Sequence, residues 1–202
     1  MVTAKLSFAV ACAAICGLCA GGASATTITF SGLAGANGSP FSTYTESGFT
    51  VTPTVGSWFQ GQAFGNPIPS IVAGGVFGGP AADSISVTDG GSRFTFSSLD
   101  FAPSPASNVD YTFTGTLGGA SVFNITGVLT PPQNFETISS TVAGDVIDDL
   151  VVSVTIVAND PNQSVNIDNI VVAAVATPEP MTLGLLATGL GLLGLAYRRR
   201  SG

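Results

Sequence analysis

Apolar and polar residues alternate in short runs over most of the chain. In Tyr111–Thr116 the aromatic rings occupy one face of an extended strand and the threonines occupy the other. Gly, Pro, Asn and Asp separate such runs and supply turn residues. No apolar repeat of helical period occurs between residues 26 and 176. Strands are therefore predicted near Thr27–Phe30, Gly48–Thr52, Ser84–Thr88, Arg93–Phe96, Leu99–Phe101, Val109–Thr116, Ala120–Leu129, Phe135–Ser139, Leu150–Val157 and Asn166–Val172.

This number of short strands in one domain predicts an all-β fold, an antiparallel two-sheet sandwich of jelly-roll type. The segment from Val55 to Pro80 differs, because it is rich in Gly and Pro yet also apolar. We interpret it as a long ordered loop that covers an end or an edge of the sandwich. The alternative is functional: Trp58 and Phe59 form an exposed aromatic platform for sugar rings.

The N-terminus carries the features of a secretory signal peptide. Lys5 gives a positive start, Leu6–Ala20 an apolar stretch, and Ala23 and Ala25 the small residues of a cleavage site. We expect a signal peptide over residues 1–25, an interaction with the secretion machinery, and a mature chain that begins at Thr26. All three cysteines lie in this segment, so the mature domain, residues 26–176, has no disulfide.

The C-terminus, residues 177–202, combines a proline-containing motif, an uncharged run and a basic cluster. The run, about residues 181–197, would span roughly 25 Å as a helix, which is the short end of the transmembrane range. Arg198, Arg199 and Arg200 follow it and favour a cytoplasmic C-terminus. The sequence thus predicts one C-terminal transmembrane helix; the alternative is a helix buried in a core.

These residues resemble the PEP-CTERM sorting signal of Gram-negative bacteria, with Pro178, Glu179 and Pro180 as the motif. Thr177 stands where a valine is frequent in that family. The resemblance implies that an exosortase-type membrane protease cleaves near the motif. It also implies a single-pass inner-membrane intermediate, followed by release to the cell surface or the extracellular matrix.

Charge is unevenly distributed along the chain. Arg93 is the only basic residue between positions 26 and 176, against eleven acidic residues, so the mature domain has a net charge near −10. Nucleic-acid binding requires clustered Lys or Arg facing phosphates, and this domain has none. The acidity fits solubility at a cell surface and is compatible with divalent cations.

Composition also restricts the chemistry. The chain has no histidine, and its one lysine lies in the signal peptide, so Ser-His-Asp and Ser-Lys catalysis cannot be built in the mature domain. A pair of carboxylates could still serve a glycoside hydrolase. Nothing identifies such a pair, so we predict that the protein is not an enzyme.

A structural calcium ion is the one cofactor that the sequence suggests. Oxygen donors gather at Asn159–Asn162 with Asn166–Asn169, and at Asp145–Asp149, although Asx-rich turns and a solvated acidic loop are the simpler interpretations. Val165–Val172 resembles the closing strand of galactose-binding-like and carbohydrate-binding jelly rolls. That resemblance implies a calcium site that joins Asp168 to an acidic residue near the first strand. Ser31 stands at the expected position, and Glu46 could substitute for it.

Three hypotheses follow from the sequence. The first is a non-enzymatic protein of the cell surface or extracellular matrix, sorted by its tail. The second is a carbohydrate-binding module, in which Trp58, Phe59 or Tyr111 contacts a polysaccharide and calcium lies near Asp168. The third is a glycoside hydrolase that uses two of the acidic residues.

Overall fold

The computed structural model describes residues 24–176, except 75–81, 104, 106–107 and 157–163. Residues Ser24–Val175 form one compact unit. The sorting motif, the apolar run and the arginine cluster of the C-terminus lie outside the described residues, as does Ala23 of the predicted cleavage site. Ala25 is the first residue of the first strand. Within the described ranges, the structure contains no helix that is long and apolar enough to cross a membrane.

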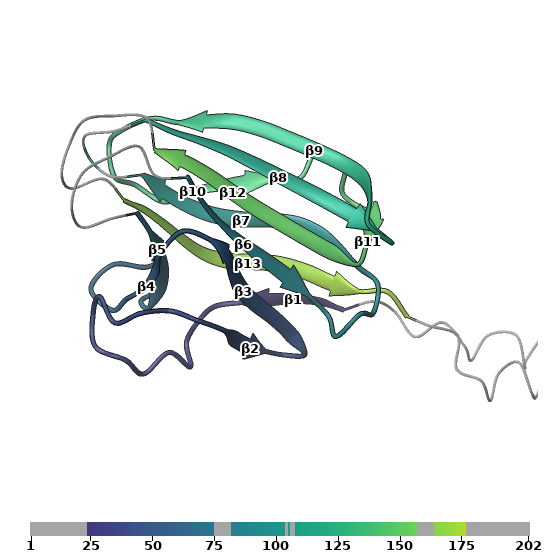
Figure 1. Cartoon of the computed structure of the whole chain (residues 1–202), viewed down its shortest axis with the longest axis horizontal. Helices are drawn as coiled ribbons and strands as arrows, with labels where there is room; N and C mark the ends of the chain where they lie inside the picture. Colours follow the sequence, from purple (N-terminus) through teal and green to yellow (C-terminus); the bar gives the residue numbers. More distant parts are fainter. Residues whose placement is uncertain (1–23, 75–81, 104, 106–107, 157–163, 177–202) are drawn as a thin grey trace, which may run out of the picture. The chain divides into compact units, whose positions relative to one another are not determined.

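Two antiparallel sheets face each other, as Figure 1 shows. Sheet A has seven strands, with β10-β7-β13-β5-β4 as its main path, β1 beside β13 and β11 beside β7. Its strands are β1 (Ala25–Ile28), β4 (Trp58–Gly61), β5 (Ser70–Ala73), β7 (Phe94–Pro103), β10 (Glu136–Ser139), β11 (Val146–Ile147) and β13 (Val165–Ala174). Sheet B has six strands in the order β2-β3-β6-β12-β8-β9. These are β2 (Tyr44–Glu46), β3 (Phe49–Val55), β6 (Ala82–Thr88), β8 (Val109–Leu117), β9 (Ala120–Leu129) and β12 (Asp149–Ile156).

The predicted all-β two-sheet sandwich is confirmed. Each predicted strand overlaps an observed one, and β9 has the predicted bounds. The two strands predicted at Arg93–Phe96 and Leu99–Phe101 are one continuous strand, β7. The register between β7 and β13 shifts between Asp168 and Val172. The side chains of β7 that point inward therefore change from even-numbered to odd-numbered residues along the strand.

The interpretation of Val55–Pro80 as one long loop is wrong at residues 58–61 and 70–73, which form strands. This segment contributes β4 and β5, which pair antiparallel with each other, and β5 also pairs with β13. The segment therefore extends sheet A. Its apolar residues alternate weakly and are interrupted by Gly and Pro, and this concealed the strand pattern.

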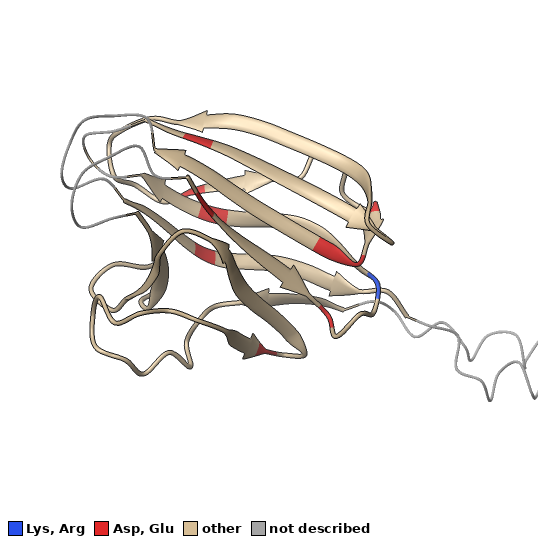
Figure 2. Cartoon of the chain, viewed as in Figure 1, with Lys and Arg blue, Asp and Glu red and all other residues tan. Residues whose placement is uncertain are grey.

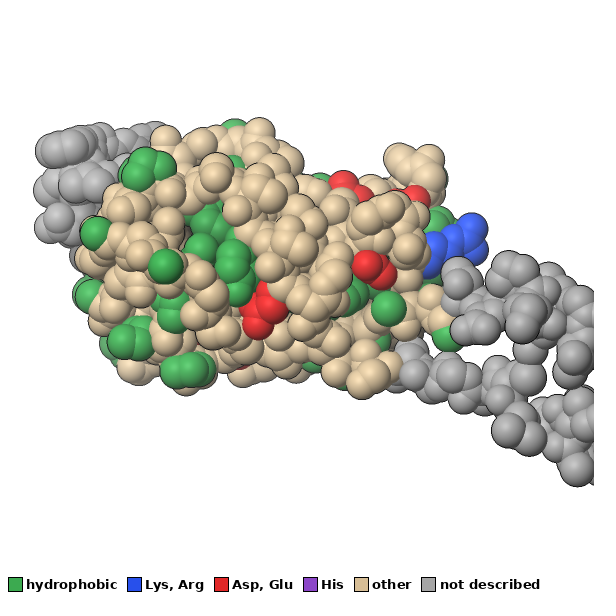
Figure 3. Space-filling model, turned by 90° about the horizontal axis from the view of Figure 1, so that it is seen from below, with side chains coloured by type: hydrophobic (Ala, Val, Ile, Leu, Met, Phe, Trp, Pro, Cys, Tyr) green, Lys and Arg blue, Asp and Glu red, His purple; other side chains and the backbone are tan. Residues whose placement is uncertain are grey.

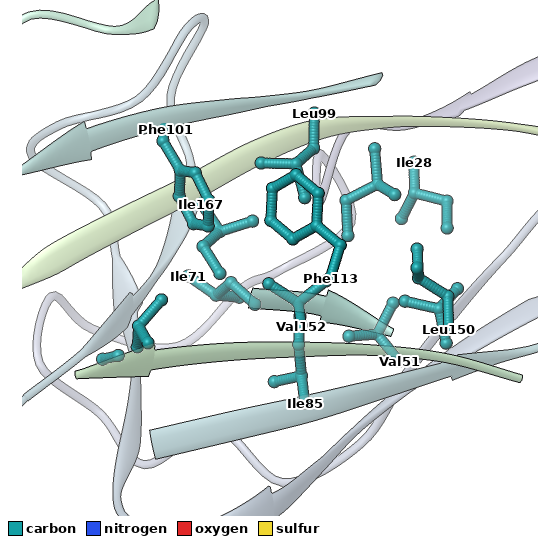
Figure 4. Packing of buried hydrophobic residues seen from close by; sticks show 14 of the residues in the cluster. Ile28, Val51, Ile71, Ile85, Leu99, Phe101, Phe113, Leu150, Val152 and Ile167 are labelled. Atoms are coloured by element: carbon teal, nitrogen blue, oxygen red, sulfur yellow. The ribbon is translucent and has the colours of Figure 1, made fainter. Parts of the chain in front are cut away.

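The core fills the space between the sheets with branched aliphatic and aromatic side chains. Figure 4 shows residues from both sheets pointing toward one another, among them Ile167 and Phe101 of sheet A and Ile85, Phe113 and Val152 of sheet B. All five are fully buried. Phe101 and Phe113 also pack ring to ring, with centroids 5.6 Å apart. The unit thus has both sheets and a continuous core of its own, the properties of a domain that folds alone.

Candidate functional site

Trp58 is a core residue, so the prediction that it forms an exposed sugar platform is wrong. Its side chain is 2% exposed, and its indole Nε1 donates to the carbonyl of Val55 at 3.1 Å. In β4 it lies opposite Ala73 on the inward side of sheet A. Phe59, the next residue, points to the other side and is half-buried. The alternation of the strand separates the two rings, so they do not form one platform.

Tyr111 is a half-buried inward-facing residue at the β8–β9 margin of sheet B. Its ring stacks on Phe113, with centroids 5.0 Å apart, and lies near Phe101. It also covers Gly127, where an added Cβ would lie 2.2 Å from the tyrosine hydroxyl. Burial and the nearby Glu136 carboxylate raise the pKa of Tyr111. The ring is therefore engaged in packing.

Glu46 fastens β2 to the end of β1. Its carboxylate accepts hydrogen bonds from the amides of Thr29 (2.9 Å) and Phe30 (3.0 Å), and from the hydroxyls of Thr29 (2.9 Å) and Tyr44 (3.2 Å). Four donors occupy a group with about four acceptor sites. Glu46 therefore holds the chain in place by hydrogen bonds, at the position where the sequence suggested a calcium ligand.

Asp168 and Asp100 form a buried carboxylate pair on the outer side of sheet A. They lie directly opposite each other on β13 and β7, and are 0% and 7% exposed. Asp168 accepts from the backbone amides of Asn66 (2.7 Å) and Asn169 (2.8 Å). Asp100 accepts from the side-chain amides of Asn66 (3.1 Å) and Asn169 (2.9 Å) and from the hydroxyl of Thr137 (2.6 Å).

The β4–β5 loop holds this pair through Asn66. Asn66 bonds to both carboxylates, and its carbonyl also accepts from the Asn169 side chain. Burial raises the pKa of Asp168 to about 6; the two backbone amides lower it, and the nearby Asp100 and Glu46 raise it further. The sequence suggested Asp168 as a calcium ligand, and in the structure its carboxylate anchors the β4–β5 loop through hydrogen bonds.

Two other suggested calcium ligands, Asp148 and Asp149, also accept hydrogen bonds from the protein, each from a different strand or turn. Asp148 accepts from the amide of Gly118 at 2.7 Å, and Asp149 from the hydroxyl of Ser86 at 2.6 Å. Residues 159–162 lie outside the described residues. Within the part of the chain that the structure describes, no group of three or more His, Cys, Asp or Glu side chains is arranged to hold a metal ion.

The outer face of sheet B is a surface of uniform chemistry. Along its strands the inward positions are apolar and buried, whereas the outward ones carry mainly Thr and Ser. The strand register arranges these residues in rows across the sheet. The first row runs through Thr45, Thr50, Thr88, Asp149 and Thr116, the second through Thr52, Ser86, Val151, Thr114 and Asn124, and the third through Ser84, Ser153, Thr112 and Thr126. We call these three rows the hydroxyl face.

The hydroxyl face has short side chains and little charge. Most of its side chains are exposed or half-buried, and neighbouring hydroxyls bond, as between Thr45 and Thr50 at 3.1 Å. Figure 2 shows that sheet B is mostly uncharged, and that the basic residue of this unit, Arg93, lies at one end. The face seen from below Figure 1 differs, because acidic side chains appear at several places on it and hydrophobic side chains gather toward one end (Figure 3). The hydroxyl face therefore offers hydrogen-bonding groups and methyl groups to a ligand without a strong electrostatic field.

Sequence reasoning found the individual Thr-rich strands but missed the surface they form. The alternation in Tyr111–Thr116 showed that the threonines share a face. It did not show that β3, β6 and β12 present the same chemistry beside β8, because that depends on strand order and register. The Asp100–Asp168 pair was missed for the same reason.

Comparisons with known proteins give structural neighbours only. No family model matches the chain, and no curated protein matches it. A family 32 carbohydrate-binding module of NanJ from C. perfringens, in complex with galactose, matches 60% of this chain and 93% of its own length, at 15% identity and a TM-score of 0.41. A family 29 carbohydrate-binding module from Piromyces equi matches 78% of this chain and 95% of its own, at 11% identity and a TM-score of 0.38.

A third structure is the enzymatically active domain of tailspike protein 4 from bacteriophage CBA120, with 15% identity and a TM-score of 0.40. This chain spans only 20% of its length. All three matches have TM-scores below 0.5 and identities of 15% or less, so they transfer no ligand and no functional residue to this chain.

Proposed function

We propose that the β-sandwich is a non-enzymatic domain that binds an uncharged polysaccharide across its hydroxyl face. The observation that carries the proposal is the register of sheet B, which aligns Thr, Ser and Asn side chains from six adjacent strands. Outward positions of antiparallel sheets are normally polar, and charged side chains are common there. Here they are almost uniformly short and uncharged.

The chemistry of this face matches that of a sugar chain. Strands lie about 4.8 Å apart, and outward residues recur about every 6.7 Å along each strand, so hydroxyls form a lattice with spacings close to the size of a sugar ring. Each hydroxyl both donates and accepts hydrogen bonds, as sugar hydroxyls do. The threonine methyls and Val151 provide apolar contact for the C–H faces of the rings.

Charge selects the class of polysaccharide. The mature domain has a net charge near −10 and one basic residue, Arg93, so an anionic polymer would be repelled. No aromatic side chain is present in the three rows of the hydroxyl face. Each sugar residue therefore contributes little binding free energy. Useful affinity requires that many sugar residues of one polymer bind to the face at the same time.

The proposal is tested by electrophoresis of the folded domain through gels that contain a neutral polysaccharide. A β-glucan, a galactan and dextran are the neutral polymers, and alginate is the anionic control. At least one neutral polymer should retard the protein, and alginate should not. Thr114→Glu places a charge in the middle row and should weaken retardation several-fold, whereas Ser139→Glu on β10 of sheet A should not. Failure of all neutral polymers to bind, or equal binding by Thr114→Glu and wild type, overturns the proposal.

We further propose that the protein is exported and sorted through its PEP-CTERM-like tail. The support is the order of the sequence signals: the signal peptide over 1–25, the Pro178-Glu179-Pro180 motif, the apolar run, and the basic cluster at 198–200. An exosortase-type membrane protease would process the tail. The domain would then reach the cell surface or matrix, where polysaccharide is available.

Replacement of Glu179 tests the sorting proposal separately from sugar binding. Glu179→Ala should leave the unprocessed precursor in the inner membrane fraction, as seen by immunoblotting of fractionated cells. Glu136→Ala, which removes an exposed carboxylate from β10, is the matched control and should be processed normally. Normal processing of Glu179→Ala, or an unexported wild-type domain, contradicts the proposal.

A further inference from the structure

The four sheet margins differ in how they avoid pairing with other chains. At one margin of sheet A, β10 has four residues, among them Glu136. At the other, β4 is covered by residues 38–41, which bond to it through Gly38, Phe41 and Gln60. In sheet B, β2 has only three residues and ends at Glu46. Short strands, charges and covering segments are the usual means of protecting a sheet edge.

The β9 margin has none of these protections. It is a ten-residue strand without a charged residue or a proline, and among the described residues it pairs only with β8. Figure 1 shows it as the outermost strand of sheet B. Its outward side chains include Val122 and Val128, which are 40% and 56% exposed. A long, uncharged edge with exposed valines favours the addition of another strand.

The sequence of β9 is complementary to itself about Ile125. Consider an antiparallel pair of two β9 strands with a twofold axis at this residue. The residue that follows Ile125 by a given number of positions in one copy then lies opposite the residue that precedes Ile125 by the same number in the other copy. Val122 then lies opposite Val128 of the second copy, and the two exposed valines cover each other. Ile125, which is half-buried, meets its own counterpart.

The remaining pairs in this register also match. Asn124 lies opposite Thr126, a pair able to hydrogen-bond, and Phe123, whose ring is buried within its own copy, lies opposite Gly127, which adds no side chain at the contact. Other registers would leave at least one valine beside a polar residue or exposed. The arrangement is isologous, so it closes at two copies and uses up both free edges.

We propose that the protein forms a twofold-symmetric dimer in which β9 of one copy pairs antiparallel with β9 of the other, centred on Ile125. Sheet B then continues from one copy to the next as a single sheet. The inference concerns the edge of the sheet, so it is independent of the proposed sugar-binding function. One consequence is that the two hydroxyl faces lie side by side on the same side of the joined sheet.

Electrostatics gives the dimer a characteristic salt dependence. Both copies carry a net charge near −10, and the β9 edge contributes no opposite charges. Repulsion between the copies must therefore weaken association at low ionic strength. Raising NaCl from about 0.02 M to about 0.3 M shortens the screening length and should lower the dissociation constant several-fold. An interface held by ion pairs would respond in the opposite direction.

The test uses the Ser24–Val175 unit, which has both sheets and the core and contains no cysteine, beside the full chain in detergent. Sedimentation velocity at about 0.1 mM protein measures the dimer fraction. Thr126→Glu adds a negative charge on the outward side of β9 and should give a monomer. Thr52→Glu makes the same change on β3, on the same face but away from this edge, and should remain dimeric. Circular dichroism confirms that both variants fold.

A disulfide test fixes the register without adding charge. Ile125→Cys should form a covalent dimer under mild oxidation, because the axis brings the two residues together. Val122→Cys should not link to itself, but should link to Val128→Cys when the two variants are mixed. A monomeric wild type at this concentration, a Thr126→Glu variant as dimeric as the wild type, or Val122→Cys that links to itself more readily than Ile125→Cys overturns the proposal.

Discussion

The buried Asp168–Asp100 pair predicts that the domain is more stable in mild acid than at neutral pH. Burial raises the pKa of Asp168 from 3.8 to about 6. A carboxyl group with a raised pKa in the folded state stabilises the fold when it is protonated. This contribution is complete below about pH 3.8 and is lost as the pH rises through about 6.

The size of the effect follows from the two pKa values. Each pKa unit corresponds to about 1.4 kcal/mol, so the change from 3.8 to about 6 amounts to about 3 kcal/mol between strong acid and neutral pH. Asp83 acts in the same direction, because burial also raises its pKa, and its Oδ2 has no hydrogen-bond partner. Urea unfolding at about pH 4.5 and pH 7, followed by the fluorescence of the buried Trp58, should detect about 2 kcal/mol of this change, since the folded and unfolded states already differ in protonation at pH 4.5.

Asp100→Asn isolates the contribution of the pair. The new amide can donate to the Thr137 hydroxyl, and its oxygen can accept from Asn66 and Asn169, so the hydrogen bonds of Asp100 are largely preserved. One charge about 5 Å from Asp168 is removed, and we expect the stability difference between the two pH values to fall by about 1 kcal/mol or more.

The exposed Asp110 of β8 provides the matched control. Asp110→Asn removes the same charge at a residue on the outer side of sheet B, and should retain the wild-type pH dependence. Equal stability at both pH values, or greater stability at pH 7, would refute the reasoning about the buried pair.

The remaining predictions concern packing and the Glu46 carboxylate. Gly115→Ala would place a Cβ 2.4 Å from Phe123 Cε1 and 2.8 Å from Ile147 Cγ2, and should cost about 1–3 kcal/mol in urea unfolding; an unchanged midpoint would mean that β8 and β9 pack less closely than described. Trp58→Ala should cost about 3–5 kcal/mol, as expected for a core residue, and a stable variant that loses only sugar binding would contradict this role. Glu46→Gln should cost about 1–3 kcal/mol, since an amide group would face donors. Calcium at about 1 mM should leave the wild-type melting temperature unchanged, and a rise of several degrees that Glu46→Gln abolishes would restore the calcium hypothesis.

The sequence predicted the fold class because the strand signal is local. In Tyr111–Thr116 and Ala120–Leu129, side chains of different polarity alternate over a whole strand, and the turn at Gly118 and Gly119 is marked by residues with positive φ. The β4–β5 hairpin was missed because Gly61, Gly65, Pro67 and Pro69 interrupt its pattern. Its strands form because β13 offers a pairing edge, which is information from another part of the chain.

The candidate site was less predictable, since it depends on which side of a sheet a residue occupies. The sequence left open whether Trp58 lies in a covering loop or on an exposed sugar platform, and the pairing of β4 with β5 turns it inward. Asp168 was identified by its sequence context, yet its partner Asp100 was not, because cross-strand pairing joins residues far apart in sequence. The same long-range pairing assembles the hydroxyl face from the six strands of sheet B.

The most direct test of the central claim is to map where a neutral polysaccharide contacts the isotope-labelled domain by NMR. Titration with a soluble neutral polymer that retards the protein should shift the amide and methyl signals of Thr52, Thr112, Thr114 and Val151, which belong to β3, β8 and β12 of sheet B. Signals of the β4–β5 loop around Asn66, on the outer side of sheet A, should remain in place. Shifts confined to that loop would contradict the account.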